Sequence, residues 1–175
     1  AVMYEKAVIV CSMADQGVEL PEGGVRNVPN RDKIALIMAG GQIIHKRALP
    51  GSEYLPPTTE ELDACFDGET RKKVFVVDWS YQPVTHHTLR MCSDLIQLAG
   101  TQIEDGSTGV VITCGTQALT EIAYFADLVW SYPQPLVFTA SIHNAETPGS
   151  ETALHLSRAV RAANSQTCWG QGVTV

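Results

Sequence analysis

The sequence has no apolar run that approaches the roughly 20 residues a membrane-spanning helix requires. Its first residues, Ala1 to Lys6, also lack the basic and apolar regions of a signal peptide. Both absences argue against a membrane partner, and they predict a cytoplasmic location for the chain.

Positive charge is also scarce. Twelve Lys and Arg residues stand against nineteen Asp and Glu residues, which gives a net charge of −7. Proteins that bind nucleic acids neutralise phosphates with clustered cations, and the longest basic run here is only residues 71–73. The expected partner is therefore not a nucleic acid.

Cysteine pairs that could bind a metal or build a disulfide framework are missing. The chain has five cysteines, an odd number, and no two of them form a C-x-x-C pair. No cluster of His, Cys, Asp or Glu has metal-ligand spacing. The sequence therefore predicts neither a metal nor another cofactor, and its separate thiols suit a reducing cytosol. The cysteines are Cys11, Cys65, Cys92, Cys114 and Cys168.

The sequence does contain an alternation of short β-branched runs with longer segments of helical periodicity. Continuous apolar runs are typical of strands that are covered on both faces. Helices are expected over residues 58–68, after Pro83, after Thr116 and over residues 150–163. This alternation predicts an α/β fold with a parallel sheet. The expected strands are Ala7–Cys11, Ile34–Met38, Val74–Trp79, Val110–Thr113, Leu136–Thr139 and Gly172–Val175.

Three of these strands end in polar or glycine-rich sequence, at residues 39–42, 78–81 and 113–117. Parallel sheets of this type bind ligands at the carboxyl ends of their strands. Glycine lets the backbone approach a ligand closely, and a helix N-terminus offers N–H groups to an anion. Glycines also form tight strand–helix turns without any ligand, but three polar strand ends together predict a small-molecule pocket.

Three segments resemble the L-asparaginase family. Residues 33–44 resemble its opening strand and threonine loop, T-G-G-T-I-A. Residues 109–129, which include V-I-T-C-G-T-Q, are similar to its V-I-T-H-G-T-D-T segment, and residues 135–141 to its P-V-V-x-x-G-A strand. The resemblance covers residues 33–175 and corresponds to the amino-terminal half of an asparaginase, with the smaller second domain absent. It implies a single flavodoxin-like, doubly wound, mostly parallel sheet, preceded by an N-terminal extension of residues 1–32 with one extra strand.

The resemblance also implies hydrolysis of an amide by a threonine, and it gives individual residues a role. Thr116 takes the place of the second catalytic threonine, and Tyr54 that of the tyrosine which assists catalysis. Ser80, followed by Tyr81, takes the place of the serine that holds the α-carboxylate of the substrate.

Two other family positions are changed. Gln42, which follows Gly41, stands at the first catalytic threonine, and a carboxamide cannot act as a nucleophile. Gln117 stands at the aspartate that binds the substrate's ammonium group, two residues after Gly115. In the family a catalytic lysine lies beyond the last strand, and the given sequence stops before that position. The two glutamines favour neutral hydrogen bonds to a ligand over the ion pair that the family forms with the ammonium group of its amino-acid substrate.

Three functions therefore remain open. The chain can be a divergent asparaginase-like amidohydrolase for a small amide, with Thr116 as nucleophile. It can be a repurposed enzyme of the same fold, such as a cyclase, isomerase or lyase of specialised biosynthesis. It can also be a non-catalytic module that binds a small molecule. In the asparaginase family the second domain of a neighbouring subunit completes each site, so a homo-oligomer is expected.

Several further residues could carry chemistry. His86 and His87 are expected early in the second helix, as surface or capping residues. His143 follows a strand near Glu146, and the two could form an acid–base pair. Cys114 could be a nucleophile if a base lowered the pKa of its thiol, although a buried structural cysteine is the simpler interpretation.

Overall fold

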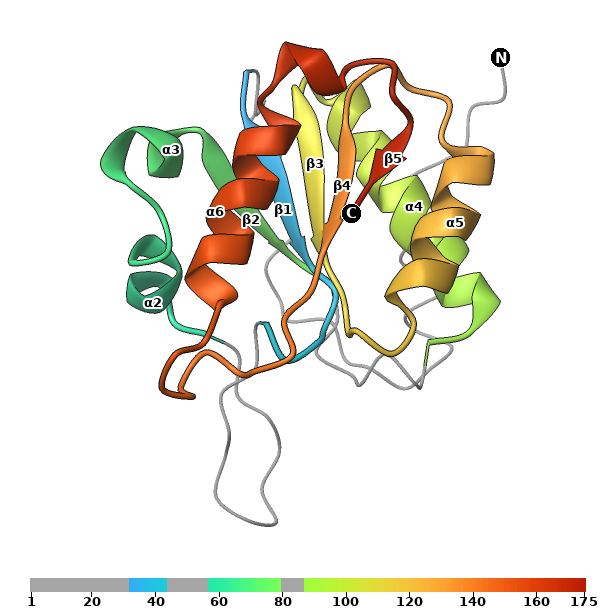
Figure 1. Cartoon of the computed structure of the whole chain (residues 1–175). Coiled ribbons are helices and arrows are strands. Elements are labelled where there is room, and N and C mark those ends of the chain that lie inside the picture. Colours follow the sequence, from blue (N-terminus) through green and yellow to red (C-terminus); the bar gives the residue numbers. More distant parts are fainter. Residues whose placement is uncertain (1–31, 44–56, 80–86) are drawn as a thin grey trace, which may run out of the picture.

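The computed structural model describes residues 32–43, 57–79 and 87–175 of the chain. Within them five parallel strands form one sheet in the order β2-β1-β3-β4-β5 (Figure 1). The predicted single α/β domain with a doubly wound parallel sheet is therefore confirmed. The predicted extra strand Ala7–Cys11 lies outside the described residues. The strands are β1 Ile34–Met38, β2 Val74–Asp78, β3 Gly109–Thr113, β4 Leu136–Thr139 and β5 Val173–Thr174.

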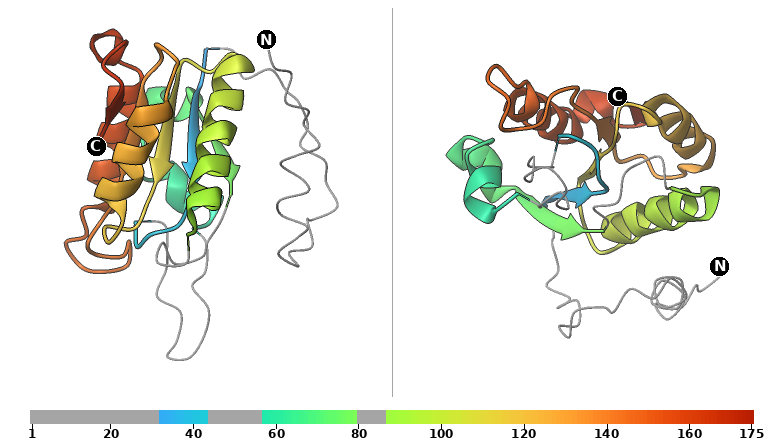
Figure 2. Two further views of the ribbon diagram at one scale, coloured as in Figure 1. Left: turned by 90° about the vertical axis from the view of Figure 1, so that its right-hand side faces the viewer. Right: turned by 90° about the horizontal axis from the view of Figure 1, so that it is seen from below.

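Helices cover both faces of this sheet. The long helices α4 (Leu89–Glu104) and α5 (Leu119–Val129) pack on one face. The other face is covered by α6 (Thr152–Ala163) and, beside it, by the short helices α2 (Thr59–Asp63) and α3 (Gly68–Lys72). Figure 2, right, shows the two groups of helices on opposite sides of the sheet. A single turn of 3-10 helix, Gln166–Cys168, precedes β5.

The central strands explain the apolar runs of the sequence. All residues of β1, β3 and β4 are buried, because alternate side chains enter the cores on the two faces. Ala35 and Ile37 of β1 face α4 and α5, whereas Ile34 and Leu36 face α6. Neither face of these strands meets water, so an alternating pattern is not needed.

Helix caps correct two of the expected boundaries. The capping box of Thr58 and Glu61 is present, but α2 ends at Asp63 instead of continuing to Gly68. A separate helix, α3, then starts after Asp67, whose side chain accepts hydrogen bonds from two N–H groups of its first turn. Similarly, the Thr88 side chain caps α4, so His87 precedes this helix instead of lying within it.

Candidate functional site

The strand order creates a switch point between β1 and β3. From β1 the chain crosses to β2 on one side, and from there to β3 on the other side of β1. The loops after two such strands diverge, and open α/β sheets bind ligands in the crevice between them. Here these loops are residues 39–43 and 114–118, at the lower end of the sheet in Figure 1.

Gly41 brings the two loops into contact. A Cβ atom on this residue would lie 2.2 Å from the carbonyl oxygen of Cys114 and 2.7 Å from the backbone nitrogen of Gly115. Gly40 and Gly41 also have φ values of 95° and 88°, which side chains disfavour. The Gly-Gly pair therefore has two roles: it forms the turn, and it lets the backbones of the two loops touch. As a result, the loop that carries Gln42 lies beside the loop that carries Thr116.

Hydrogen bonds fix the ends of the central strands. The Thr113 hydroxyl accepts a bond of 3.0 Å from the Ala39 N–H, although 74 residues separate the two in sequence. On the other side of β3, the Cys114 N–H donates to the Thr139 carbonyl at 2.9 Å. Thr113 is completely buried. The base of both loops is therefore part of the rigid sheet.

The structure brings several of the predicted site residues to this edge. Gly41 and Gly115 are buried at the contact between the loops, while Gln42, Thr116 and Gln117 are exposed beside it. Within the described part of the chain, no hydrogen bond involves the Thr116 hydroxyl. The other predicted site residues, Tyr54, Ser80 and Tyr81, lie outside the described residues.

The start of α5 adds an electropositive element. Its N-cap residue is Ala118, which cannot accept a hydrogen bond through its side chain, and no other side chain caps the helix. The N–H groups of an uncapped first turn carry partial positive charge and attract anions. This end of α5 follows Thr116 directly, so an anionic group of a ligand would be favoured beside that hydroxyl.

Cys114 does not have the properties of a nucleophile. Its side chain is 2% exposed, and burial raises the pKa of the thiol to about 12. The reactive species of cysteine is the thiolate, which is almost absent at neutral pH with such a pKa. The interpretation as a buried structural cysteine is therefore the one that the geometry supports.

The loop after β4 contains a polar cluster around His143. The Nδ1 atom of His143 lies 2.9 Å from the Glu151 carboxylate, a partner that the sequence did not suggest. The other oxygen of Glu151 accepts bonds from the Ser141 hydroxyl and from the Ile142 N–H, both at 2.9 Å. The bond from His143 is the main cause that lowers the pKa of the Glu151 carboxyl far below its ordinary value.

The family motif holds a signal for this pair. The Ala140–Asn144 segment stands where the family has G-A-M-R-P, and Glu151 stands at the aspartate of its D-G turn. The signal was visible in the sequence, but the contact between the two positions required the fold.

Two features are absent from the described residues. No group of three or more His, Cys, Asp or Glu side chains in this part of the chain could hold a metal ion. No helix among the described segments is long and apolar enough to cross a bilayer.

A doubly wound parallel sheet with glycine-rich loops at its switch point places the chain in the class of open α/β domains, in which ligand sites lie at the strand ends. The model of the asparaginase N-terminal domain matches residues 33–175. The chain therefore belongs to the asparaginase family, and the part described here is its N-terminal domain.

Individual relatives agree with this assignment. An L-asparaginase of Bacillus licheniformis is 29% identical over 153 residues, which cover 82% of this chain and 45% of that protein. A glutaminase-asparaginase of Pseudomonas fluorescens biotype A is 37% identical over 67 residues, or 38% of this chain and 18% of that protein. The chain spans less than half the length of these relatives.

The fold itself matches a solved structure. A crystal structure described as a probable cytoplasmic L-asparaginase from Campylobacter jejuni superposes with a TM-score of 0.71 and 19% identity. The match covers 82% of this chain and 43% of that chain. At this identity the likeness shows the common fold alone.

Proposed function

We propose that the site at the β1 and β3 strand ends hydrolyses a small amide, with Thr116 as the nucleophile. The observation that carries this proposal is the contact of Gly41 with the Cys114–Gly115 backbone, which places the two family loops side by side. Membership of the asparaginase family supports the class of reaction. The exposure of Thr116 at the switch point supports its role.

In the proposed reaction, Oγ1 of Thr116 attacks the carbonyl carbon of the amide. The C–N bond breaks, the hydroxyl proton passes through a base to the leaving nitrogen, and ammonia departs. Water then hydrolyses the resulting ester, which releases a carboxylate and restores the threonine. The uncapped start of α5 favours the negative charge that develops on the carbonyl oxygen. Tyr54 is proposed to assist the attack.

The base in this proposal is His143. It follows β4, the neighbour of β3, so it emerges at the same edge of the sheet as Thr116. Its Nδ1 is held by the Glu151 carboxylate, an arrangement that fixes the orientation of the imidazole ring. The other ring nitrogen, Nε2, makes no hydrogen bond within the described segments. It is therefore the atom proposed to accept the proton.

The proposed substrate differs from asparagine in its charge. Gln42 and Gln117 are both neutral, and both are exposed at this edge. A carboxamide offers hydrogen bonds, but it provides no net charge for an ammonium group. A carboxylate of the substrate would be bound by Ser80 and Tyr81. We therefore expect amides without a free α-amino group to be preferred over asparagine and glutamine.

Release of ammonia tests the proposal directly. Asparagine, glutamine, succinamate and N-acetylasparagine would each be incubated with the protein and with its Thr116→Ala variant. Thr120→Ala is the matched control, because Thr120 is also exposed but lies within α5, beyond the loop. We expect turnover of succinamate and N-acetylasparagine, the two amides without a free α-amino group, a loss of at least a hundredfold in Thr116→Ala, and no change in Thr120→Ala.

Substitution of the base tests its role separately. We expect the His143→Gln variant to lose roughly 10²–10⁴-fold in rate. A rate unchanged in this variant would assign the proton transfer to another group. Turnover that persists in Thr116→Ala would remove the nucleophile from the proposal, and no turnover by folded protein would refute hydrolysis.

A second candidate function is binding or altered carbonyl chemistry without hydrolysis. It is favoured by the observation that no residue in the described part of the chain bonds to the Thr116 hydroxyl. In that case the neutral Gln42 and Gln117 hold a ligand that is not cleaved. Binding of succinamate in calorimetry, combined with no ammonia release, is the expected result for this alternative.

The proposal extends to the assembly and location of the protein. Relatives of about twice the length match this chain over less than half of their sequence. Membership of the asparaginase family, whose members are typically oligomeric, supports an assembly of several copies. We expect a homo-oligomer at micromolar concentration in sedimentation velocity, and a cytoplasmic location. A monomer alone over that range would contradict the assembly.

A further inference from the structure

Helix α5 carries three of the eight large apolar residues that are exposed in the described part of the chain. Its inner side, which includes Ile122 and Ala126, is buried against the sheet. Tyr124 and Leu128 lie on the outer side, one turn apart, and are 67% and 65% exposed. Glu121 is also exposed and precedes Tyr124 by three residues, so these three side chains form one stripe along the helix, the α5 stripe. Exposed apolar side chains that gather in this way mark a surface for another protein.

The α5 stripe is negatively charged and has no cation beside it. The sequence contains no Lys or Arg between Arg90 and Arg158, a stretch that includes β3, α5 and β4. Glu121 takes part in no ion pair or hydrogen bond within the described segments. The other acidic residue of the helix, Asp127, accepts a bond of 2.9 Å from the N–H group of Val173, which is a neutral donor. A partner with a basic surface would therefore be favoured here.

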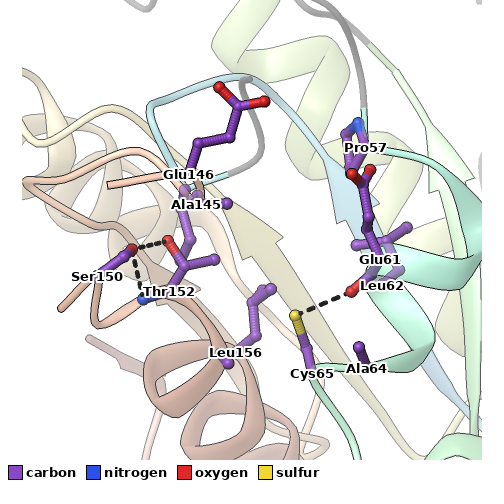
Figure 3. Close-up of a pocket in the computed structure, with 12 residues that line it drawn as sticks. Pro57, Glu61, Leu62, Ala64, Cys65, Ala145, Glu146, Ser150, Thr152 and Leu156 are labelled. Carbon is purple, nitrogen blue, oxygen red and sulfur yellow. Dashed lines mark hydrogen bonds between the residues drawn. The ribbon is translucent and has the colours of Figure 1, made fainter. Parts of the chain in front are cut away.

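Helix α6 has the opposite charge on its outer side. Its inner side faces the sheet and α2, and Figure 3 shows Thr152 and Leu156 at a cavity of about 270 Å³ between α2 and the start of α6. Leu154, Arg158 and Arg161 are exposed and form the α6 stripe. Neither arginine makes an ion pair or hydrogen bond with any part of the chain that the structure describes, and α6 itself contains no acidic residue.

The two stripes have matching spacing. The residues of the α5 stripe are three and then four positions apart, whereas those of the α6 stripe are four and then three positions apart. When two helices pack antiparallel, the order of one is reversed, so these stripes align residue by residue. The alignment gives an apolar pair, a cation–π pair and an ion pair. The pairs are Leu128 with Leu154, Tyr124 with Arg158, and Glu121 with Arg161.

We propose that the α5 stripe of one copy of the chain binds the α6 stripe of a second copy, with the two helices antiparallel. The two helices cover opposite faces of the sheet (Figure 2), so the stripes cannot meet within one copy. Two α5 stripes packed antiparallel would place Glu121 against Leu128 and leave the carboxylate without a cation, whereas the α6 stripe supplies one. The proposal rests on the homo-oligomer expected above and identifies its surfaces, but it does not depend on hydrolysis.

Reversal of one charge tests the contact. In Glu121→Arg two arginines would face each other across the contact, and in Arg161→Glu two glutamates would. Both residues are exposed, so either variant should keep the fold. We expect the unchanged chain to self-associate with a dissociation constant on the order of 1–100 μM, which suits a contact of one helix pair. Each single variant should weaken this association at least tenfold in sedimentation velocity, because like charges then meet.

An equimolar mixture of the two variants is the decisive measurement. Each α5 stripe then finds an α6 stripe of opposite charge on the other variant. We expect the mixture, and equally the double variant Glu121→Arg/Arg161→Glu, to associate within about threefold of the unchanged chain. Damage to the fold in either variant would not be repaired by mixing.

Matched controls separate the contact from net charge. Lys33→Glu and Glu60→Arg change the net charge by the same amounts at exposed residues outside both stripes, and they should leave association unchanged. Tyr124→Ala should weaken association at least fivefold, since aromatic residues contribute strongly to interfaces. Added salt should weaken it as well, because the ion pair is screened.

The outcomes distinguish this contact from the assembly as such. An oligomer that persists unchanged in Glu121→Arg and Arg161→Glu would overturn the contact but keep the homo-oligomer. A mixture that associates no better than either variant alone would also overturn the contact. A chain that stays monomeric up to about 500 μM, well above the expected constants, would refute both the contact and the homo-oligomer.

Discussion

The contact between the two site loops can be tested by adding one methyl group to Gly41. In Gly41→Ala the new Cβ would lie 2.2 Å from the Cys114 carbonyl oxygen and 2.5 Å from its carbon, both of which are backbone atoms. The φ of 88° adds a second cost, because L-residues disfavour the left-handed region by about 1–2 kcal/mol. A backbone cannot rotate away as a flexible side chain can, so one loop has to move.

The magnitude follows from these two terms. Forcing an extra methyl into a packed position typically costs a further 1–3 kcal/mol. We therefore expect Gly41→Ala to reduce the free energy of unfolding by about 2–5 kcal/mol. This loss is a large share of the total stability of an ordinary domain, which is about 5–15 kcal/mol. Any hydrolytic activity should fall as well, since the displaced loop carries Gln42.

Substitutions at two other glycines distinguish the cost of the backbone conformation from the cost of the steric contact. Gly149 has a φ of 81° but has nothing within 4 Å of its Cβ position, so Gly149→Ala should lose only the backbone term of about 1–2 kcal/mol. Gly68 begins α3 with open space at its Cβ position and no positive φ. Gly68→Ala should therefore stabilise the protein by up to about 1 kcal/mol.

The assay is urea unfolding of the three variants, followed by circular dichroism, with the midpoint and slope fitted separately. In thermal scans each kcal/mol corresponds to about 2–4 °C for a domain of 150–250 residues. The reasoning fails if Gly41→Ala loses no more stability than Gly149→Ala, because the loops would then not be in contact at this point.

Three other changes follow from the described contacts. The lowered pKa of Glu151 means that its contribution to stability is present above its ordinary pKa near 4.5 and is lost as pH falls below that value, so Glu151→Gln should flatten the acid side of a stability curve from urea unfolding at pH 3–7. The thiol of Cys114, with its pKa of about 12, should react with iodoacetamide at pH 8 only as fast as the protein unfolds; rapid labelling of the native state, located by peptide mass, would contradict its burial. Gly100→Ala places a Cβ 2.9 Å from the Tyr132 ring, which should cost about 1 kcal/mol. It should also lower the Tyr132 pKa from about 12 by disturbing the bond to Glu104, a change visible in an ultraviolet titration.

The strands could be predicted because a short stretch of sequence is enough to indicate that both of their faces are buried. The run Ile34–Met38 contains no polar residue, which is the pattern of a strand that lies between two layers of helices. The polar strand ends at residues 39–42 and 113–117 were also readable, because parallel strands bring their carboxyl ends to one edge. The N-cap at Asp67 was not predicted from the sequence. Asp is one of the residues preferred at this position, because its side chain can accept hydrogen bonds from the first turn, here from the N–H groups of Glu69 and Thr70.

Other features depend on contacts between distant segments. The pairing of His143 with Glu151 is decided by where the start of α6 lies relative to the loop after β4. The cavity between α2 and α6 requires a gap between these two helices, and no spacing in the sequence encodes such a gap. The role of Gly41 is similar, because its neighbour Cys114 is far along the chain.

The strand order also determines how the chain must fold. β1 is central, yet its Ile34 pairs with Val74 and Gly109, and no two neighbouring strands of the described sheet are joined by a tight turn. Each pairing must first close a long loop, whose entropy is lost before any ladder bond forms. The helices α4 and α6 are local, and we expect them to form before the interior of the sheet does. We therefore expect slow folding, with the apolar β1 exposed until its partners arrive, as a consequence of placing the site loops on interior strands.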